Sequence, residues 1–285
     1  MREFAFSTNQ HEFIKSAVLA GIRHDGRTPQ KLRNPVHLTV KSTMCECVIG
    51  ETHVVSSATL DIVTPFPDRP QEGQVLFSTS YSSLATPDNS LIDDSSLNRA
   101  VERVFRETQC IEPEALCITA GKRVWKLSIS TTVLNHSGNS LDCCVLSIAS
   151  LLSHFKVPAV FVDDTGNYVV QDPTLQPPVA LPLFHLPISV SLVVIEKVIL
   201  VDPNREEEVV ADSHIHIVVN RSNEICVLSS KGEPLTKEML SEAVTVAFNV
   251  SRQFYDLIET AKVIEQPLKS STVIPMEDEE LDLES

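Results

Sequence analysis

The chain has 285 residues, of which 42% are hydrophobic and 21% charged, proportions that are ordinary for a globular protein of one large domain or two lobes. Its formal net charge is −15, and six of its acids lie between Glu277 and Glu284, so the remaining body still carries about −9. A protein this acidic is a poor independent binder of polyanions, because that affinity comes mostly from Lys and Arg. Any contact with nucleic acid is therefore expected through a local patch or within an assembly.

The distribution of apolar residues argues against a membrane or secreted protein. Apolar runs such as residues 190–200 are interrupted by charge and are shorter than the roughly 18 to 20 residues that a transmembrane helix needs. The N-terminus carries charges and amides where a signal peptide would be apolar. Seven cysteines, an odd number without a repeating spacing, favour reduced thiols. We therefore expect a soluble, intracellular protein without membrane contacts.

Hydrophobic periodicity predicts groups of strands that alternate with helices. Helical spacing covers residues 3–21, 91–108, 140–152 and 234–264. Strand patterns cover residues 36–40, 45–49, 52–63, 73–81, 124–134, 158–162, 168–170, 186–194, 198–201, 212–219 and 224–228. This order predicts an α+β protein of two sheet-plus-helix lobes.

The predicted elements divide the chain into four parts. An N-terminal helix and an Arg-rich turn occupy residues 1–30, the first lobe residues 31–155, and the second lobe residues 156–266. Residues 267–285 lose periodicity and end in an acidic run, which is typical of a disordered tail.

The central stretch, residues 116–152, predicts a strand, a turn and a core helix. The turn at residues 136–139 leads directly into the helix, which Asn139 or Ser140 is placed to cap. Such a turn can hold a phosphate, because free backbone N–H groups and the positive end of the helix dipole converge there. However, Asp142 lies in the first helical turn, and no Lys or Arg occurs from the turn to the end of the helix. A bound phosphate would meet a carboxylate without a cationic partner.

One predicted helix carries a row of arginines. Arg99 and Arg103 are four residues apart and Arg106 follows three further on, so the three share a face. A solvated face with ion pairs to Glu102 and Glu107 is one interpretation. A contact surface for a phosphodiester chain is the other.

No metal site is expected from the His and Cys patterns. His214 and His216 lie on one face of a predicted strand, but no third ligand is nearby, so surface or core histidines are favoured. Neither Cys45 with Cys47 nor the adjacent pair at 143–144 has the two-residue spacing of a zinc site, which favours core thiols.

A set of different short motifs is distributed along residues 12–264. They are Asp25-Gly26-Arg27, Arg69-Pro70 with Glu72-Gly73, LCITAGKRVW at 116–125, LNHSGN at 134–139, Val201-Asp202-Pro203 with its acidic run, and NEIC at 223–226. Each is weak alone, but together and in this order they resemble the RNase-PH-like subunits that form the ring of the eukaryotic RNA exosome. The resemblance implies an RNase PH-like fold of two pseudo-symmetric lobes, like ribosomal protein S5 domain 2.

The resemblance also implies partners and a place in the cell. It implies a hetero-hexameric ring of RNase-PH-like subunits, cap subunits with RNA-binding domains, an associated catalytic exoribonuclease, and RNA in the central channel. It implies no cofactor. Localisation in the nucleus, nucleolus and cytoplasm is expected on the same ground.

Active members of this family degrade RNA from the 3′ end by phosphorolysis and hold phosphate with a Gly-(Ser/Thr)-Arg segment at this turn. The matching positions here are Gly138, Asn139 and Ser140, so Ser140 stands where the family's Arg would be. The resemblance therefore indicates a degenerate phosphate site.

Two further family features are also altered. The Arg pair that clamps RNA in active subunits aligns with Ser96 and Leu97. The acidic pair aligns with Glu208 and, for its second member, with Asp212 if a gap is allowed or with His214 without one. Arg99 and Arg103 match the spacing at which inactive members line the RNA path, so these two residues and Arg106 form the predicted RNA-binding surface.

These features predict a non-catalytic, structural and RNA-guiding subunit of the exosome core ring, acting in 3′–5′ RNA processing and degradation, including rRNA maturation. Carboxylates alone cannot perform phosphorolysis, because attack by an anion on an anionic diester needs cationic or dipolar stabilisation. One alternative is a phosphate-dependent exoribonuclease whose site is shared with a neighbouring subunit. Another is a free-standing adaptor whose acidic tail binds a basic partner.

Overall fold

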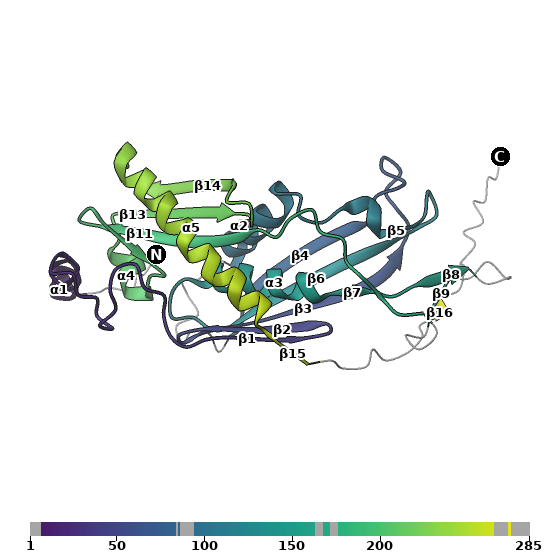
Figure 1. The fold of residues 1–285 in the computed structure, drawn as a ribbon, viewed down its shortest axis with the longest axis horizontal. Coiled ribbons are helices and arrows are strands. Elements are labelled where there is room, and N and C mark those ends of the chain that lie inside the picture. The colour runs from purple at the N-terminus through teal and green to yellow at the C-terminus, as the bar shows by residue number, and fades with distance from the viewer. Residues whose placement is uncertain are drawn as a thin grey trace, which may run out of the picture.

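The computed structural model describes residues 7–83, 85, 94–162, 168–171, 176–264 and 273–274, and it contains two main β-sheets (Figure 1). Of the predicted tail, residues 267–272 and 275–285 lie outside the described residues, and so does the start of the helix predicted from residue 91. The described elements confirm the α+β class.

The first sheet joins seven strands in the order β15-β1-β2-β3-β6-β4, with β5 beside β6. They are β1 (Val36–Lys41), β2 (Met44–Ile49), β3 (Thr52–Val63), β4 (Gln74–Tyr81), β5 (Cys117–Thr119), β6 (Arg123–Asn135) and β15 (Lys262–Ile264). Alternate residues of β3 from Thr52 to Ala58 are buried, so one face of the sheet is core. β3 and β6 pair antiparallel along most of their length, and β6 runs straight into the central turn.

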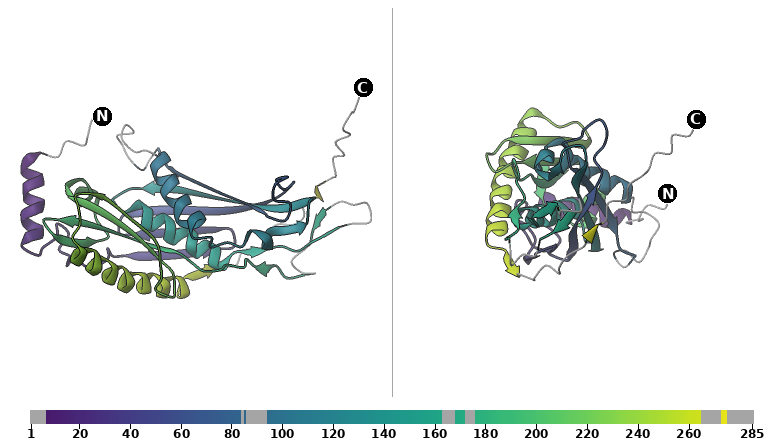
Figure 2. Two further views of the ribbon diagram at one scale, coloured as in Figure 1. Left: turned by 90° about the horizontal axis from the view of Figure 1, so that it is seen from above. Right: turned by 90° about the vertical axis from the view of Figure 1, so that its right-hand side faces the viewer.

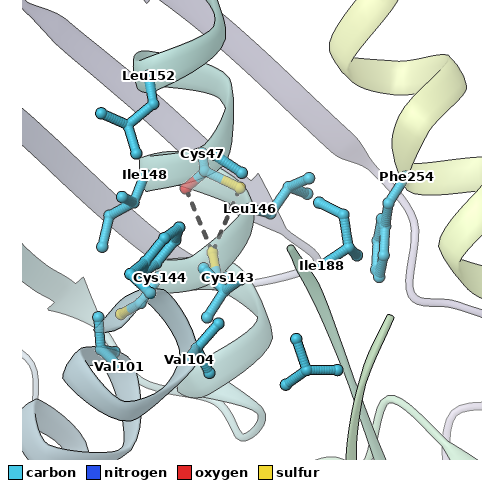
Figure 3. Packing of buried hydrophobic residues seen from close by; sticks show 14 of the residues in the cluster. Cys47, Val101, Val104, Cys143, Cys144, Leu146, Ile148, Leu152, Ile188 and Phe254 are labelled. Atoms are coloured by element: carbon cyan, nitrogen blue, oxygen red, sulfur yellow. Dashed lines mark hydrogen bonds between the residues drawn. The ribbon is translucent and has the colours of Figure 1, made fainter. Parts of the chain in front are cut away.

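Helix α3 (Ser140–His154) lies at the centre of the molecule, between the two sheets. Twelve of its 15 residues are buried, which is the pattern of a helix that is covered on all sides. One side packs on β1, β2 and β3, and the other packs on β11 of the second sheet. Figure 3 shows its Cys143 and Cys144 among apolar side chains, with the Cys143 thiol directed at the carbonyl and sulfur of Cys47.

The second sheet has the order β12-β11-β13-β14. Its strands are β11 (Ile188–Ile195), β12 (Val198–Val201), β13 (Ser213–Val219) and β14 (Ile225–Gly232), all antiparallel to their neighbours. Helix α5 (Lys237–Glu259) covers one face through residues such as Phe254, and α3 packs against β11 (Figure 1). Every residue of β11 is buried, because both faces of the strand are covered.

The end of α5 differs from the sequence-based expectation. Periodicity predicts a helix to residue 264, but the helix ends at Glu259 and residues Lys262–Ile264 form β15. This strand pairs in parallel with β1, at the edge of the first sheet. Because three residues are too few to show a period, the helical pattern concealed the strand.

The remaining elements lie at the periphery. They are α1 (Thr8–Leu19), α2 (Asp94–Glu107), the short 3-10 helix η1 (Pro113–Leu116), α4 (Arg205–Val210), β7 (Lys156–Val157), β8 (Val160–Val162), β9 (Tyr168–Val170), β10 (Val179–Ala180) and β16 (Val273–Ile274). Helix α1 stands at one end of an elongated molecule, where Ile14 and Val18 pack in a small separate cluster with α4 and β11 (Figure 2). Among the described residues, no helix has the length and apolarity that would let it cross a membrane.

Candidate phosphate and RNA site

The turn at residues 136–139 brings the first sheet against the second. Gly138 has φ +93°, and a Cβ at this position would lie 2.5 Å from the backbone N of Arg205 and 2.6 Å from the carbonyl O of Pro203. The Arg205 N–H donates to the Ser137 carbonyl at 3.3 Å. The predicted phosphate turn is therefore packed backbone to backbone on the segment that precedes α4, and only glycine fits there.

A buried Arg33–Asp202 pair holds this junction. All five side-chain N–H donors of Arg33 are engaged: two reach Asp202 at 2.8 and 3.0 Å, and the others reach Thr52 and the carbonyls of Ser137 and Gly138 at 2.8 to 3.2 Å. The Arg33 guanidinium is the main favourable partner that holds the pKa of Asp202 below its ordinary value against the opposing effect of burial. This pair was not predicted, because Arg33 is remote in sequence from the turn and no local pattern marks it.

The arginines of the Arg-rich turn, which precedes Arg33 in the chain, also hold segments of the fold together. Arg23 is buried and pairs with Glu207, and it also donates to the Val201 carbonyl at 2.7 Å. Arg27 donates to Asp25 and to the Asp202 carbonyl. The Asp25-Gly26-Arg27 motif therefore attaches the N-terminal segment to the end of the second sheet.

The anion position at the start of α3 is occupied by Glu208. The backbone N–H of Asn139, the residue that precedes the helix, donates to the Glu208 carboxylate at 2.6 Å. Glu208 comes from α4, and its burial raises its pKa to about 7 although the Asn139 hydrogen bond and Arg33 act against the shift. An acid of this chain thus takes the backbone donor that a phosphate would use.

The prediction that Asp142 blocks the turn is wrong in its choice of carboxylate. Asp142 is directed at β11 and Asn139: it accepts from the Ser189 and Ser191 hydroxyls at 2.8 and 2.7 Å, from the Ser191 N–H at 2.7 Å, and from the Asn139 side chain at 2.9 Å. Burial raises its pKa to about 6. Asn139 precedes the helix as expected, but it has φ +50° and its side chain makes no capping hydrogen bond.

The expectation of a turn without cations also needs correction. No Lys or Arg is local in sequence, but Arg33 comes from another segment, and Arg205 and Arg33 both help to lower the pKa of His136 to about 4, after burial as the main cause. Neutral His136 faces Ser140, with 2.6 Å between its Nδ1 and the hydroxyl oxygen. Ser140, at the position of the family's Arg, is therefore a buried partner of a neutral imidazole.

The predicted acidic pair is not assembled. Glu208 lies at the turn, whereas Asp212 accepts from Lys15 of α1 at 3.0 Å and from the Glu196 N–H at 2.8 Å. His214, the ungapped alternative, lies opposite Lys231 on β14. Within the described part of the chain, no group of three or more His, Cys, Asp or Glu residues is placed to hold a metal ion.

The predicted RNA-binding arginines lie on α2, which packs on α3 and β4. Arg103 pairs with Glu107 at 2.9 Å and Arg106 with Glu102 at 2.8 Å, and about half or more of each arginine side chain is exposed. Arg99 donates to the carbonyl and the hydroxyl of Ser95 on its own helix, at 3.2 and 3.0 Å. Arg99 and Arg103 line a cavity against the second sheet, whereas Arg106 is not among its lining residues.

Comparisons with known proteins decide the family. Residues 36–158 match the model for domain 1 of the 3′ exoribonuclease (RNase PH) family, and residues 185–250 match domain 2. Exosome complex component RRP45 of Danio rerio is 33% identical over 269 residues, covering 92% of this chain and 68% of the relative. The chain belongs to the RNase PH family. The LCITAGKRVW, LNHSGN and NEIC segments, on which the resemblance to the RNase-PH-like ring subunits is based, lie at residues 116–125, 134–139 and 223–226.

Other relatives of this RNase PH family member extend from animals to archaea. Exosome complex component RRP45 of Homo sapiens is 32% identical over 240 residues, and exosome complex component Rrp42 of Methanopyrus kandleri is 32% identical over 252 residues. The human match covers 81% of this chain and 54% of the relative, so the chain spans little more than half of that protein. The archaeal match covers 84% of this chain and 91% of the relative.

Solved structures confirm the RNase PH-like fold. A chain of an archaeal exosome core superposes with a TM-score of 0.72 at 25% identity, covering 88% of this chain and 96% of that chain. A chain of the Archaeoglobus fulgidus exosome with RNA bound to the active site gives a TM-score of 0.74 at 24% identity, covering 87% and 97%, and it supports the fold alone.

Proposed function

We propose that this RNase PH family member is a non-catalytic, structural and RNA-guiding subunit of an exosome core ring, acting in 3′–5′ RNA processing and degradation. Its relatives are named as exosome components, which supports the assembly. In this proposal it joins other RNase-PH-like subunits in a hetero-hexameric ring with cap subunits and an associated catalytic exoribonuclease. It acts in the nucleus, nucleolus and cytoplasm.

The observation that carries the non-catalytic part is the hydrogen bond from Asn139 to Glu208. A phosphate at the start of α3 would have to displace a carboxylate held at 2.6 Å, and it would find Arg33 already committed to Asp202, Thr52 and two carbonyls. Because Glu208 takes the backbone donor and Arg33 is engaged by other groups, neither stabilises the charge that accumulates as phosphate attacks a phosphodiester.

The test of inactivity is phosphorolysis by a reconstituted ring. The ring is incubated with RNA and inorganic phosphate, with this chain either unchanged or carrying Glu208→Ala. We expect the substitution to leave the yield of nucleoside diphosphates unchanged. Diphosphates that disappear with Glu208→Ala would falsify the non-catalytic assignment and favour the shared-site exoribonuclease.

The RNA-guiding part rests on the exposed arginines of α2. We expect Arg99→Glu combined with Arg103→Glu to reduce crosslinking of RNA in the ring at least tenfold and to leave assembly intact, because phosphate contacts supply most of the affinity for RNA. The matched control is Lys237→Glu with Arg252→Glu, which changes the net charge equally on exposed positions of α5. Equal crosslinking in both double variants would remove the assignment.

Size measurement of the native protein separates this proposal from the adaptor alternative. The chain has a mass of 31.5 kDa, so a ring member elutes as part of a much larger particle. A monomeric native species would contradict ring membership.

A further inference from the structure

A cavity of about 230 Å³ lies between α2 and the second sheet, outside the phosphate turn. Its walls are mostly apolar and come from α2, the start of α3, and strands β13 and β14: Ala100, Val104, Leu141, Val218 and Val227. Pockets that bury drug-sized ligands are usually about 300–1,000 Å³. The cavity therefore has room for one ring-sized group and excludes a whole nucleotide.

The polar part of the cavity is built and oriented by buried contacts. His216 has its Nδ1 3.0 Å from the Ser191 hydroxyl, which in turn donates to buried Asp142 at 2.7 Å. Ser189, also in the lining, donates to the same carboxylate at 2.8 Å. Burial lowers the pKa of His216 to about 4, so its ring is neutral near pH 7 and offers one donor and one acceptor nitrogen. The described residues provide no hydrogen-bond partner for the second ring nitrogen.

The cavity is lined by two exposed cations, Arg99 and Arg103. The ion pair of Arg103 with Glu107 has half-exposed side chains, so it is weak and a phosphate can replace the carboxylate. Lys231 lies directly opposite His214, and Ser229 directly opposite His216, on the strand face that carries Val218 and Val227. This face therefore changes from charged to polar to apolar toward the cavity.

We propose that this cavity receives one unstacked nucleobase of single-stranded RNA, with the flanking phosphates on Arg99 and Arg103. Single-stranded RNA is recognised by splayed bases that lie on aromatic or guanidinium planes and form hydrogen bonds through their edges. The two guanidinium groups, the apolar walls and the free edge of His216 supply these elements. The inference rests on the RNA-guiding function proposed above and adds a base-binding site to it.

The test is photocrosslinking in the reconstituted ring with RNA that contains 4-thiouridine, followed by mapping of the crosslinked peptides. We expect base crosslinks on peptides from α2, β13 and β14. Val227→Phe, which fills the cavity, should reduce them about tenfold, equivalent to about 1.4 kcal/mol. Leu228→Phe on the same strand, where the side chain is 43% exposed, is the matched control and should not reduce them. An RNA of the same length with abasic riboses should compete less well than intact RNA.

The outcomes separate the base site from the guiding function. If Val227→Phe leaves the crosslinks unchanged while charge reversal of Arg99 and Arg103 abolishes them, RNA follows α2 without a base site and this inference fails. If neither change has an effect, both proposals fail. Ala100→Leu fills the same cavity from the helix side, so it replaces Val227→Phe if thermal unfolding shows that the phenylalanine variant does not fold.

Discussion

Replacement of Glu208 by glutamine should flatten the pH dependence of stability. Burial raises the pKa of Glu208 from an ordinary 4.5 to about 7. Between these values the folded state holds a proton that the unfolded state has lost, so the free energy of unfolding decreases as pH rises through this window. From about pH 5.5 to pH 7 the interval is about 1.5 units, which at about 1.36 kcal/mol per unit gives about 2 kcal/mol. Glutamine keeps an oxygen for the Asn139 N–H but does not titrate.

The measurement is urea denaturation of the full chain at several pH values from about 5.5 to 8, above the sequence pI of about 5.0. At each pH we compare the free energy of unfolding of Glu208→Gln with that of the wild type. We expect the wild type to lose about 2 kcal/mol relative to the variant as pH rises. The control is Glu206→Gln on the same helix, where the side chain is 44% exposed. Parallel pH curves for wild type and Glu208→Gln, or the same trend in the control, would refute the reasoning.

Three further predictions concern packing and thiol access. Gly138→Ala should lower the free energy of unfolding, measured by urea denaturation, by about 2–5 kcal/mol, because alanine would be strained at this positive φ and its Cβ would clash with the backbone of residues 203–205. A loss below about 1 kcal/mol would contradict this close approach. Asp202→Asn should lower the free energy of unfolding by about 3–5 kcal/mol, because it leaves the buried Arg33 guanidinium without its charge partner. Asp212→Asn should lower it by only about 0–1 kcal/mol, because the Lys15–Asp212 pair is partly exposed. Equal losses in the two variants would contradict the argument from burial. Under native conditions maleimide should label Cys117 and Cys226 before the five buried thiols, as peptide mass spectrometry can show; prior labelling of a buried thiol would indicate an open core.

The local part of the central region could be predicted from the sequence, because it depends on neighbouring residues. The alternation before the turn and the helical spacing after it correctly place β6, the turn and α3. The three arginines of α2 fall on an accessible face as expected, and two of them border a cavity. Their role in RNA contact remains a prediction.

The rest of the site depends on contacts between distant segments, which a single sequence does not reveal. Glu208 is 69 positions from Asn139, and Arg33 is 105 positions from Gly138, so no local period connects either pair. The prediction chose Asp142 because it is adjacent to the turn, but its buried serine partners come from β11. Proximity along the chain was therefore a poor guide to which carboxylate meets the helix.

The parallel pairing of β15 with β1 has a consequence for how the protein is made. Thr39 pairs with Lys262, so the β1 edge of the first sheet is completed only after the residues up to Ile264 have left the ribosome. Until then β1 of the nascent chain is an unpaired edge strand, and unpaired edge strands readily form hydrogen bonds with other chains. A fragment that stops at the end of α5 would keep this liability permanently, and we expect it to accumulate as aggregates or in chaperone-bound form.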